Sequence, residues 1–434
     1  MSGDETARRP RVLVLGGGFG GLQCARKLAG KPVDVLLVDR NNYHLFTPLL
    51  YQVASSLLNP SEISFPLRHI LRRGKNVLVR RAEIERIDFA ERRAIAFDGP
   101  AFAYDWLVIA TGAETNFYGI DSVERAGFGL KDLPDGMALR NHVLDCFEAA
   151  LLETDPAARQ GWLTFLVVGG GPTGVEYAGA LSELFRLVLP ADFPDLDVGR
   201  SRVILVEALD RLLYEFPPEL GDYTKGALER KGVEVRLGTR VSGVEGDSAV
   251  RLADGGLVSA RTLIWAAGVR PIAPATEPPL PRTRQGRIEV DASLRVRGHD
   301  RVFVIGDAAA MLEDGKPLAM MAPQAMQAGR HVAAQILRAI EDRPLEDFHY
   351  RDKGVMATIG RSAGVAAIGP LRLKGFLGWM GWLVVHLYFL IGFRNRFVVL
   401  SRWTYNYFRL DRPIRLIARS APSKSPRTVS SSNP

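Results

Sequence analysis

Short hydrophobic runs that end at glycines occur twice along the chain, and each predicts the same local structure. The first run, residues 11–15, stops at a glycine cluster; a helical pattern then covers 22–28 and a second apolar run covers 33–38. Apolar runs of this length next to glycine are typical of buried strands. The order therefore predicts a strand, a helix and a second strand parallel to the first.

A second unit with the same order of elements begins at residue 163. Its strands are predicted at 163–168 and 203–206, with a helix from 175 to about 189 between them. Two similar units in one chain suggest an internal duplication. Further buried strands are predicted at 76–79 and 106–109, and a helix is predicted at about 322–340. The pattern as a whole predicts an α/β fold.

The pattern changes near the carboxyl end. Residues 376–393 carry no formal charge and are bracketed by arginines and a lysine. This length is near the lower limit for a helix that crosses a membrane. The next segment repeats its large apolar residues at steps of three to four, which predicts an amphipathic helix with one apolar face: Phe397, Leu400, Trp403 and Tyr407.

Three interpretations fit this carboxyl-terminal region: a single membrane span, an anchor that enters the membrane from one side, and a face buried in a homodimer. An oligomer face rarely needs so many flanking arginines, so the pattern favours a monotopic anchor through residues 371–420. His386, inside the apolar run, is interpreted as a buried histidine whose hydrogen bonds are satisfied.

Composition narrows the class of protein. A chain of 434 residues is expected to form two or three domains. Its two cysteines, Cys24 and Cys146, are far apart, which excludes a disulfide scaffold and a zinc site built from cysteines. We predict no metal site. The amino terminus lacks an apolar signal segment, so synthesis and residence in the cytoplasm are expected.

The positive charge is confined to one end of the chain. The net charge is +8, but residues from 371 onward hold eleven Lys or Arg and one acidic residue, which leaves the rest of the chain at about −2. A basic body would favour nucleic acid, whereas a basic tail among aromatic residues favours a membrane surface. We therefore predict no nucleic-acid partner.

The first glycine cluster has the spacing of a dinucleotide-binding loop. Such a loop needs glycines for its turn, for the approach of a pyrophosphate and for close contact of helix and strand, and the phosphates lie at the helix amino terminus. Asp39, at the end of the following strand, is placed to accept a hydrogen bond from a ribose hydroxyl. The cluster consists of Gly16, Gly17, Gly18, Phe19, Gly20 and Gly21.

The second glycine cluster repeats this spacing as Gly169, Gly171 and Gly174, and Glu207 ends its second strand. A carboxylate at that position accepts a hydrogen bond from a 2′-hydroxyl and repels a 2′-phosphate, which favours NADH over NADPH. Arg211 lies nearby in sequence and weakens that preference.

Other small-residue motifs fall at the ends of later strands. Two turns follow apolar strands, and an acidic residue, Asp307, follows the strand predicted at 302–305; Asp307 is either a flavin contact or an ordinary helix cap. Glu176 falls in the first turn of the second helix, where it is either functional or a partner of the helix dipole. The two turns are Ala110, Thr111 and Gly112, and Ala266, Ala267 and Gly268.

The ordered motifs GGGFGG, ATG, GGGPTGVE, AAG and IGDAA resemble the two-dinucleotide flavoprotein disulfide-reductase superfamily. Within it, NYHLFTPLLYQVA (42–54) and HLYFLIGFRNR (386–396) are similar to segments of the type II NADH:quinone oxidoreductases. The resemblance runs from about residue 11 to residue 416.

This resemblance implies a doubly wound fold in which one Rossmann-type domain is inserted into another. The implied divisions are an FAD-binding domain at 1–117 and 290–340, an inserted NADH-binding domain at 118–289, a membrane-anchoring region at 341–420 and a disordered tail at 421–434. It also implies that FAD contacts Arg40, Ile84 and Ala325 in addition to the first glycine cluster, Asp39, the turn at 110–112 and Asp307.

The resemblance implies two catalytic residues. Glu176 matches a glutamate near the stacked nicotinamide and flavin. Members of the family commonly carry a glutamine at the start of the helix under the flavin; here that position holds Pro323, and Gln324 is displaced by one residue. One residue on a helix is a rotation of about 100°, so the role of Gln324 is the most weakened assignment.

The implied activity is oxidation of NADH, with FAD as cofactor and two-electron reduction of a membrane quinone, without proton pumping, at the cytoplasmic face of the cell membrane. Two alternatives remain open: a flavoprotein reductase of a ferredoxin-type carrier, and a membrane-attached NAD(H)-binding sensor. Reductases that act on disulfides or sulfide need cysteines at the flavin, which Cys24 and Cys146 do not provide.

Overall fold

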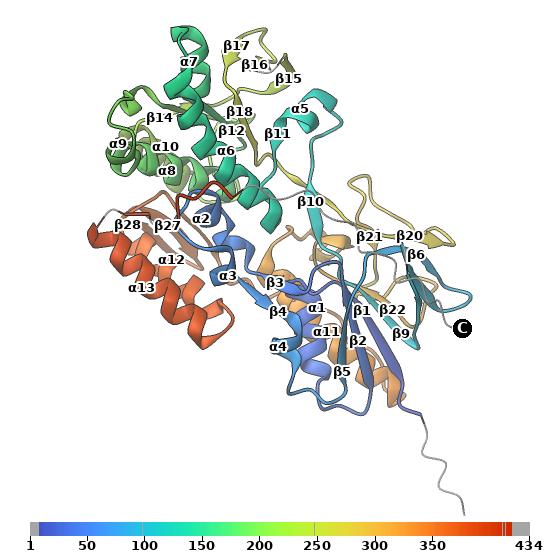
Figure 1. The fold of residues 1–434 in the computed structure, drawn as a ribbon. Helices are drawn as coiled ribbons and strands as arrows, with labels where there is room; N and C mark the ends of the chain where they lie inside the picture. Colours follow the sequence, from blue (N-terminus) through green and yellow to red (C-terminus); the bar gives the residue numbers. More distant parts are fainter. Residues whose placement is uncertain (1–7, 98, 247, 410, 413, 419–434) are drawn as a thin grey trace, which may run out of the picture.

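The computed structural model describes residues 8–97, 99–246, 248–409, 411–412 and 414–418. The tail predicted at 421–434 lies outside these residues. Within them, the two predicted strand–helix–strand units are confirmed, with boundaries that shift by a few residues. Figure 1 shows one unit at each end of the molecule, with the carboxyl-terminal helices on one side.

The first unit forms a parallel sheet with β1 at its centre. Leu13 of β1 lies opposite Leu36 of β2 on one side and Leu107 of β9 on the other. The strands are apolar along most of their length because both faces of the sheet are covered. The strands in spatial order are β22 (Val302–Val304), β9 (Trp106–Ile109), β1 (Arg11–Leu15), β2 (Asp34–Asp39) and β5 (Val77–Arg81). Helices α1 (Phe19–Leu28) and α11 (Ala322–Ile340) pack against each other beside this sheet.

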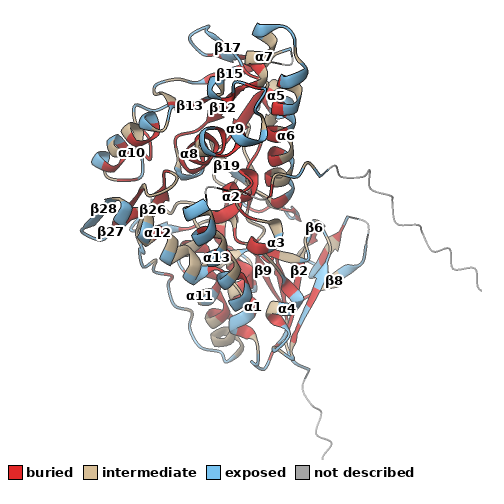
Figure 2. Cartoon of the chain, turned by 60° about the vertical axis from the view of Figure 1, so that its left-hand side comes forward, coloured by how far each residue is buried: buried red, intermediate tan, exposed pale blue. Residues whose placement is uncertain are grey.

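Four neighbouring strands of the second sheet follow the order of four in the first, which agrees with the predicted internal duplication; the fifth strand of the second sheet comes first in the chain rather than last. Leu166 of its central strand lies between Ile204 and Leu263, as Leu13 does in the first sheet. The strands in spatial order are β11 (Gly127–Phe128), β18 (Thr262–Trp265), β12 (Thr164–Val168), β13 (Arg202–Val206) and β14 (Val233–Arg236). Helix α8 (Pro172–Leu187) follows its glycine loop. In Figure 2 the buried residues are concentrated in the two sheets and in the helices against them.

Two short strands connect the units. β10 (Ala113–Thr115) leaves the first sheet and pairs antiparallel with β19 (Val269–Pro271), which returns from the second. β20 (Ala275–Glu277) then pairs with β6 (Ile84–Asp88), so the chain is beside the first unit again before residue 289. The domain boundaries stay predictions, and this pairing supports an earlier return than 289.

The remaining elements cover the sheets or join them. The other helices are α2 (Leu50–Ala54), α3 (Pro60–Ile63), α4 (Leu67–Leu71), α5 (Asp121–Ala126), α6 (Leu133–Leu152), α7 (Pro156–Trp162), α9 (Leu189–Asp192) and α10 (Pro218–Arg230). Small antiparallel sheets contain β3 (Tyr43–Leu45) and β4 (Ser64–Pro66); β7 (Arg93–Ala96) and β8 (Ala101–Ala103); and β15 (Val241–Glu245), β16 (Ala249–Leu252) and β17 (Leu257–Ser259).

The carboxyl-terminal region is a three-stranded antiparallel sheet followed by two helices. The strands are β26 (Val355–Thr358), β27 (Gly364–Ile368) and β28 (Leu371–Gly375). The apolar run at 376–393 does not form one helix: α12 (Phe376–Phe389) ends before Gly392, which has φ +90°, and α13 (Phe393–Arg409) follows. Among the described residues no helix is long and apolar enough to cross a membrane.

The predicted apolar face of α13 is wrong in its composition. Phe397 and Leu400 are 64% and 48% exposed, whereas Trp403 is 9% exposed and lies in the main hydrophobic cluster. Two successive three-residue steps rotate the side chain by about 120° around a helix, so Trp403 no longer shares a face with Phe397. The outer face instead carries Phe393, Phe397, Leu400 and Phe408, and the inner face carries Asn395, Val399 and Trp403.

Candidate functional site

A cleft of about 550 Å³ lies at the carboxyl ends of the strands of the first sheet. Open parallel sheets bind ligands at this edge, because the loops that follow the strands meet there. The cleft brings together almost every residue predicted to contact the flavin; of that set, Gly21 is not in the lining. The predicted residues that line it are Gly16, Gly17, Gly18, Phe19, Gly20, Asp39, Arg40, Ile84, Ala110, Thr111, Gly112, Asp307 and Ala325.

The glycines of the first loop have different tasks. Gly16 has φ +102°, and a Cβ there would lie 2.3 Å from the Ala110 carbonyl oxygen. A Cβ on Gly21 would lie 1.9 Å from the Gly16 carbonyl oxygen, so Gly21 allows the helix to start against the strand. A Cβ on Gly18 would meet nothing within 4 Å. The backbone at Gly18 is therefore open to the pyrophosphate of a bound dinucleotide.

The Asp39 carboxylate is held by the loops around it. Its oxygens accept hydrogen bonds from the backbone N–H groups of Gly17 and Asn41, each at 2.6 Å. Burial raises the pKa of Asp39, and these two hydrogen bonds act in the opposite direction. Because each carboxylate oxygen has a second lone pair, the group still accepts hydrogen bonds from a ribose.

The second glycine loop repeats this arrangement. Gly169 has φ +109°, a Cβ on Gly174 would lie 1.9 Å from the Gly169 carbonyl oxygen, and a Cβ on Gly171 would meet nothing within 4 Å. The Glu207 carboxylate accepts hydrogen bonds from the N–H groups of Gly170 and, at 2.8 Å, Leu209. The two loops therefore offer the same backbone geometry to two dinucleotides.

Arg211 contacts Tyr214, three residues further along the chain. Its guanidinium lies 4.4 Å from the centre of the Tyr214 ring and donates a hydrogen bond to the Tyr214 carbonyl oxygen at 2.8 Å. At the end of the same sheet, the Ala267 carbonyl oxygen accepts a hydrogen bond from the Tyr118 hydroxyl at 3.1 Å. Tyr118 also lies against Gly268, where a Cβ would be 2.3 Å from its hydroxyl oxygen.

Several lining residues were missed in the sequence. Asp307 forms an ion pair with Lys131 at 3.2 Å, and Lys131 comes from the segment before α6, far away in sequence. Such a distant pair has no local signal. The segment 41–47 directly follows Arg40 and lies within the stretch of family resemblance, but its residue types show no chemistry of their own. The missed lining residues of that segment are Asn41, Tyr43, Leu45 and Thr47.

Glu176 lies outside the cleft lining, in contact with the carboxyl-terminal region. It is 7% exposed, and its Oε1 accepts hydrogen bonds from Trp382 Nε1 at 2.9 Å and from the Thr358 N–H at 3.2 Å. Burial raises the pKa of Glu176 to about 8, although the two hydrogen bonds lower it. The carboxyl group therefore gains and loses a proton near neutral pH. Neither Trp382 nor Thr358 has a sequence signal that links it to Glu176.

Gln324 is buried near the start of α11 but does not line the cleft, whereas Ala322 and Ala325 do. Pro323 is accommodated at the second helical position. The Oε1 atom of Gln324 is buried and finds no hydrogen-bond donor among the described residues. A buried acceptor without a donor fits a site that a bound group completes. The assignment of Gln324 and Glu176 as catalytic stays a prediction.

The buried cysteines and His386 have structural environments. Cys24 and Cys146 are free thiols, and burial raises the pKa of each to about 12, so neither is a thiolate. His386 stacks on Trp382 with ring centres 4.0 Å apart, and its Nδ1 lies 2.7 Å from the Trp382 carbonyl oxygen. His386 is half-buried rather than buried, and the lowering of its pKa to about 4 by its surroundings leaves the ring neutral.

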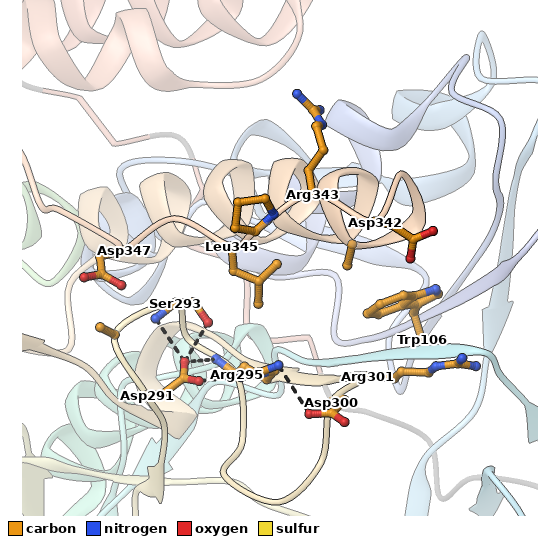
Figure 3. Close-up of a pocket in the computed structure, with 13 residues that line it drawn as sticks. Trp106, Asp291, Ser293, Arg295, Asp300, Arg301, Asp342, Arg343, Leu345 and Asp347 are labelled. Atoms are coloured by element: carbon orange, nitrogen blue, oxygen red, sulfur yellow. Dashed lines mark hydrogen bonds and ion pairs between the residues drawn. The ribbon is translucent and has the colours of Figure 1, made fainter.

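A second hollow, of about 740 Å³, lies near the end of α11 and contains none of the predicted site residues (Figure 3). Its charged groups pair with each other: Asp291 accepts hydrogen bonds from Ser293 and Arg295, and Arg295 also contacts Asp300. These polar groups are satisfied within the protein. The first glycine loop therefore belongs to the cleft of about 550 Å³, whereas the predicted residues of the second loop line neither of these two hollows.

Comparison with known proteins places these loops in a family. Residues 10–329 match the pyridine nucleotide-disulphide oxidoreductase family. The type II NADH:quinone oxidoreductase Ndh of Mycobacterium tuberculosis is 37% identical over 426 residues, covering 94% of this chain and 90% of the relative. The NdhA protein of the same organism, which has the same description, is 38% identical over 93% of this chain and 88% of the relative. The chain belongs to the type II NADH:quinone oxidoreductase family.

More distant relatives agree with this membership. The type II NADH:quinone oxidoreductase of Staphylococcus haemolyticus is 32% identical, covering 85% of this chain and 92% of its own. Among solved structures, NDH2 from Plasmodium falciparum in complex with NADH matches with a TM-score of 0.86 at 21% identity, covering 94% of this chain and all of that one. Sulfide:quinone oxidoreductase from Aquifex aeolicus matches at 0.68 and 16% identity. These two likenesses show a shared fold.

Proposed function

We infer that the protein oxidises NADH and passes two electrons to a quinone, with FAD as its cofactor and without proton pumping. The observation that carries this inference is the identity of 37–38% with two type II NADH:quinone oxidoreductases along more than nine-tenths of the chain. The duplicated dinucleotide loops supply the two nucleotide sites that the reaction needs. When bound, FAD supplies the redox chemistry between hydride donor and quinone.

The first glycine loop is the proposed FAD site. The open backbone at Gly18 and the helix that starts there suit the pyrophosphate, and Asp39 suits the ribose. Asp307 and Lys131 together form a polar wall of the same cleft. The remaining proposed FAD contacts are Gly16, Gly17, Phe19, Gly20, Arg40, Ile84, Ala110, Thr111, Gly112 and Ala325.

The second glycine loop is the proposed NADH site, with Gly169, Gly171 and Gly174 at the pyrophosphate. Glu207 is fixed by two backbone N–H groups and accepts a hydrogen bond from the 2′-hydroxyl, while its charge repels the 2′-phosphate of NADPH. The turn with Ala267 and Gly268 is the proposed nicotinamide end, by analogy with the turn at 110–112 of the first unit.

A half-reaction experiment tests the function. The FAD-loaded protein is mixed anaerobically with NADH, and then with a short-chain quinone. Bleaching by NADH followed by return of the oxidised flavin spectrum on quinone addition supports the proposal. Bleaching without reoxidation by quinone, but with reoxidation by a ferredoxin-type carrier, favours the carrier reductase instead. Reduction of the flavin by NADH that takes minutes favours the membrane-attached NAD(H)-binding sensor.

We further propose that the protein lies on the cytoplasmic face of the cell membrane through α12 and α13. The outer face of α13 exposes large apolar residues, with Phe393 85% and Phe408 76% exposed, and arginines border it. The inner face is fixed: Arg402 pairs with the buried Glu62, and Trp403 Nε1 donates to Gln52 Oε1 at 2.8 Å. A preformed apolar face with a basic border suits insertion into one leaflet.

Vesicle binding tests the membrane proposal and separates it from a homodimer. Phe397→Ser with Phe408→Ser should reduce co-sedimentation with anionic vesicles at least several-fold, because two exposed aromatic side chains no longer enter the leaflet. Leu152→Ser is the matched control, since Leu152 is 85% exposed and lies on α6. Unchanged vesicle binding, with a dimer that falls apart in the double variant, shows instead that this face joins two copies of the chain.

A further inference from the structure

The side chain that holds Glu176 comes from a helix with an exposed apolar face. Trp382 of α12 is fully buried, and its indole N–H donates to Glu176 Oε1. On the other side of the same helix, large apolar residues are exposed: Leu377, Val384 and Tyr388. A short rigid helix therefore joins the proposed membrane face to the proposed catalytic carboxyl group.

The two donors to Glu176 act on one oxygen. Trp382 Nε1 and the Thr358 N–H both donate to Oε1, and among the residues described no hydrogen bond reaches Oε2. When this carboxyl group is protonated, the oxygen that accepts the two hydrogen bonds is its carbonyl oxygen, because the proton on the other oxygen avoids both donors. This geometry assigns the proton to Oε2.

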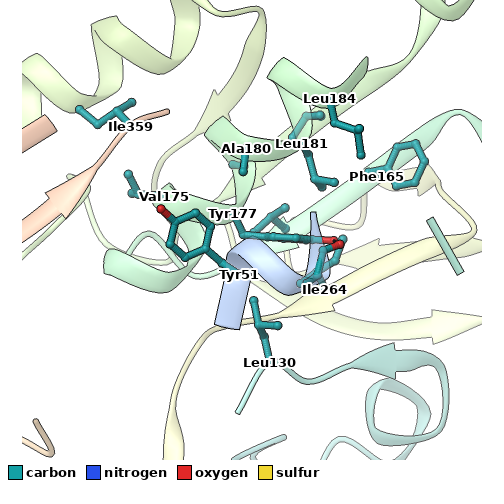
Figure 4. Close-up of a cluster of buried hydrophobic side chains, with 14 of the residues drawn as sticks. Tyr51, Leu130, Phe165, Val175, Tyr177, Ala180, Leu181, Leu184, Ile264 and Ile359 are labelled. Carbon is teal, nitrogen blue, oxygen red and sulfur yellow. Dashed lines mark hydrogen bonds between the residues drawn. The ribbon is translucent and has the colours of Figure 1, made fainter. Parts of the chain in front are cut away.

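The side chains packed around Trp382 and Glu176 are mostly uncharged and hydrogen-bonded to one another. Tyr51 of α2 lies against α8 beside Val175 and Tyr177 (Figure 4). Its ring centre is 6.2 Å from that of Trp382. The Tyr51 hydroxyl accepts a hydrogen bond from Gln52 Nε2 at 2.8 Å, and Gln52 Oε1 is held by Trp403 of α13.

The titratable and charged groups around this cluster are few. His386 covers one face of Trp382 and is neutral. Glu183 and Arg412 pair at 3.6 Å, and Arg412 also donates to the Ser55 and Ala180 carbonyl oxygens. Tyr51 feels the charges of Glu176, Glu183 and Arg412, and the pKa of Tyr51 stays well above its ordinary value through burial. Burial raises the pKa of Glu176 to about 8, so this carboxyl group changes charge near neutral pH.

We propose that Trp382 is a positioning residue that fixes the Glu176 carboxyl group, so that Oε2 carries the proton. The orientation of this carboxyl group then depends on how α12 packs against α8. This inference rests on the proposed quinone reductase function and extends it to the carboxyl-terminal region. Trp382 does not itself touch a reacting atom; it acts through Glu176.

The test compares pH profiles of quinone reduction in the FAD-loaded, full-length protein. Trp382→Phe keeps the ring in place but removes the N–H donor. That hydrogen bond favours the charged carboxylate, so its loss should raise the pKa of Glu176. The limb of the pH–rate profile that reports this pKa should therefore move upward by about one pH unit. Trp403→Phe is the matched control, because it removes an indole N–H on the neighbouring helix that does not contact Glu176. The limb of its pH–rate profile should stay at the same pH as in the unmodified protein.

The rate of flavin reduction by NADH provides the second measurement. It should change by no more than about twofold in Trp403→Phe, because that indole contacts neither Glu176 nor a glycine loop. Glu176→Gln should abolish the limb, which assigns the limb to this residue. An unshifted limb in Trp382→Phe, or an equal shift in Trp403→Phe, overturns the positioning role. A limb that survives in Glu176→Gln overturns both this inference and the proposed role of Glu176, whereas loss of quinone turnover in the unmodified protein overturns the proposed function.

Infrared difference spectroscopy keeps the inference testable if Trp382→Phe fails to fold. The carbonyl band of protonated Glu176 is assigned in the unmodified protein by its absence in Glu176→Gln. Because Oε1 accepts two hydrogen bonds, this band should lie at a lower frequency than the C=O band of a carboxyl group whose carbonyl oxygen accepts none. A band at the frequency of a free carbonyl overturns the assignment of the proton to Oε2.

Discussion

At the scale of residues, the two nucleotide sites depend on the same few atoms. Asp39 and Glu207 each accept a hydrogen bond from the N–H of the second glycine of their loop. Each also accepts one from the N–H of the residue two positions after the acid itself. These contacts orient each carboxylate before any nucleotide binds. The sequence indicates both acids because strand end, glycine spacing and acid lie close together in the chain, and their role toward a ribose stays a prediction. The contact of Glu176 with Trp382 spans 206 residues and has no such local signal.

The first loop allows a matched pair of alanine substitutions. Gly21→Ala places a Cβ 1.9 Å from the Gly16 carbonyl oxygen and should destabilise the fold by about 3 kcal/mol or more. Gly18→Ala meets no neighbour and has φ −68°, so the free energy of unfolding should change by less than about 1 kcal/mol. Its methyl group instead occupies the path of the pyrophosphate, and FAD affinity should fall by about tenfold or more.

Denaturant unfolding and FAD titration check this pair. Equal losses of stability in the two variants, or unchanged FAD affinity in Gly18→Ala, would show that the loop does not hold the pyrophosphate in this way.

The buried carboxyl group of Glu176 makes stability depend on pH. Its pKa is raised from 4.5 to about 8 in the folded protein, so the folded state holds a proton that the unfolded state has released. This stabilising contribution is complete below about pH 4.5 and is lost as pH rises through about 8. Glu176→Gln does not titrate. Its Tm relative to the unmodified protein should therefore increase as pH is raised from about 5 to about 9. A Tm difference that stays constant over this range contradicts a raised pKa.

At the scale of elements, the parallel strands were predictable and the carboxyl-terminal helices were only partly so. Strand β1 is apolar along most of its length and stops directly before Gly16, and β9 is apolar throughout and is followed by a turn of small residues, so the sequence indicates where each strand stops. The run at 376–393 is apolar throughout, so hydrophobicity alone does not show that the helix stops at Phe389. The face of α13 depends on which side the rest of the protein covers. Its inner face contains arginine and asparagine because their partners lie on the segment 52–62.

The buried pair of Arg402 and Glu62 should hold α13 in place. The Glu62 side chain is only 8% exposed, and removing its partner leaves a buried charge. Arg402→Ala should lower the free energy of unfolding by about 2–3 kcal/mol, somewhat less than for a fully buried pair. Arg200→Ala is the control, because Arg200 and Asp197 are both well exposed and their loss should cost less than about 1 kcal/mol. Denaturant unfolding measures both, and equal effects would contradict a role of this pair in docking α13.

At the scale of the whole molecule, a duplicated nucleotide-binding unit is joined to a small carboxyl-terminal region. The duplication was predictable because each copy carries its own glycine loop and acid. How the carboxyl-terminal region contacts the second unit was not, because those contacts join β26 and α12 to α8 through single side chains such as Trp382. Helix α8, which follows the proposed NADH loop, is thus joined to the helices that carry the proposed membrane face (Figure 1).

Steady-state turnover of the purified, FAD-loaded protein tests the central claim most directly. NADH oxidation is followed with a short-chain quinone, with NADPH in place of NADH and with quinone omitted as controls. We expect sustained oxidation that requires quinone and is at least about tenfold faster with NADH than with NADPH, because Glu207 repels the 2′-phosphate. Rapid reduction of the flavin by NADH without turnover on quinone would contradict the account.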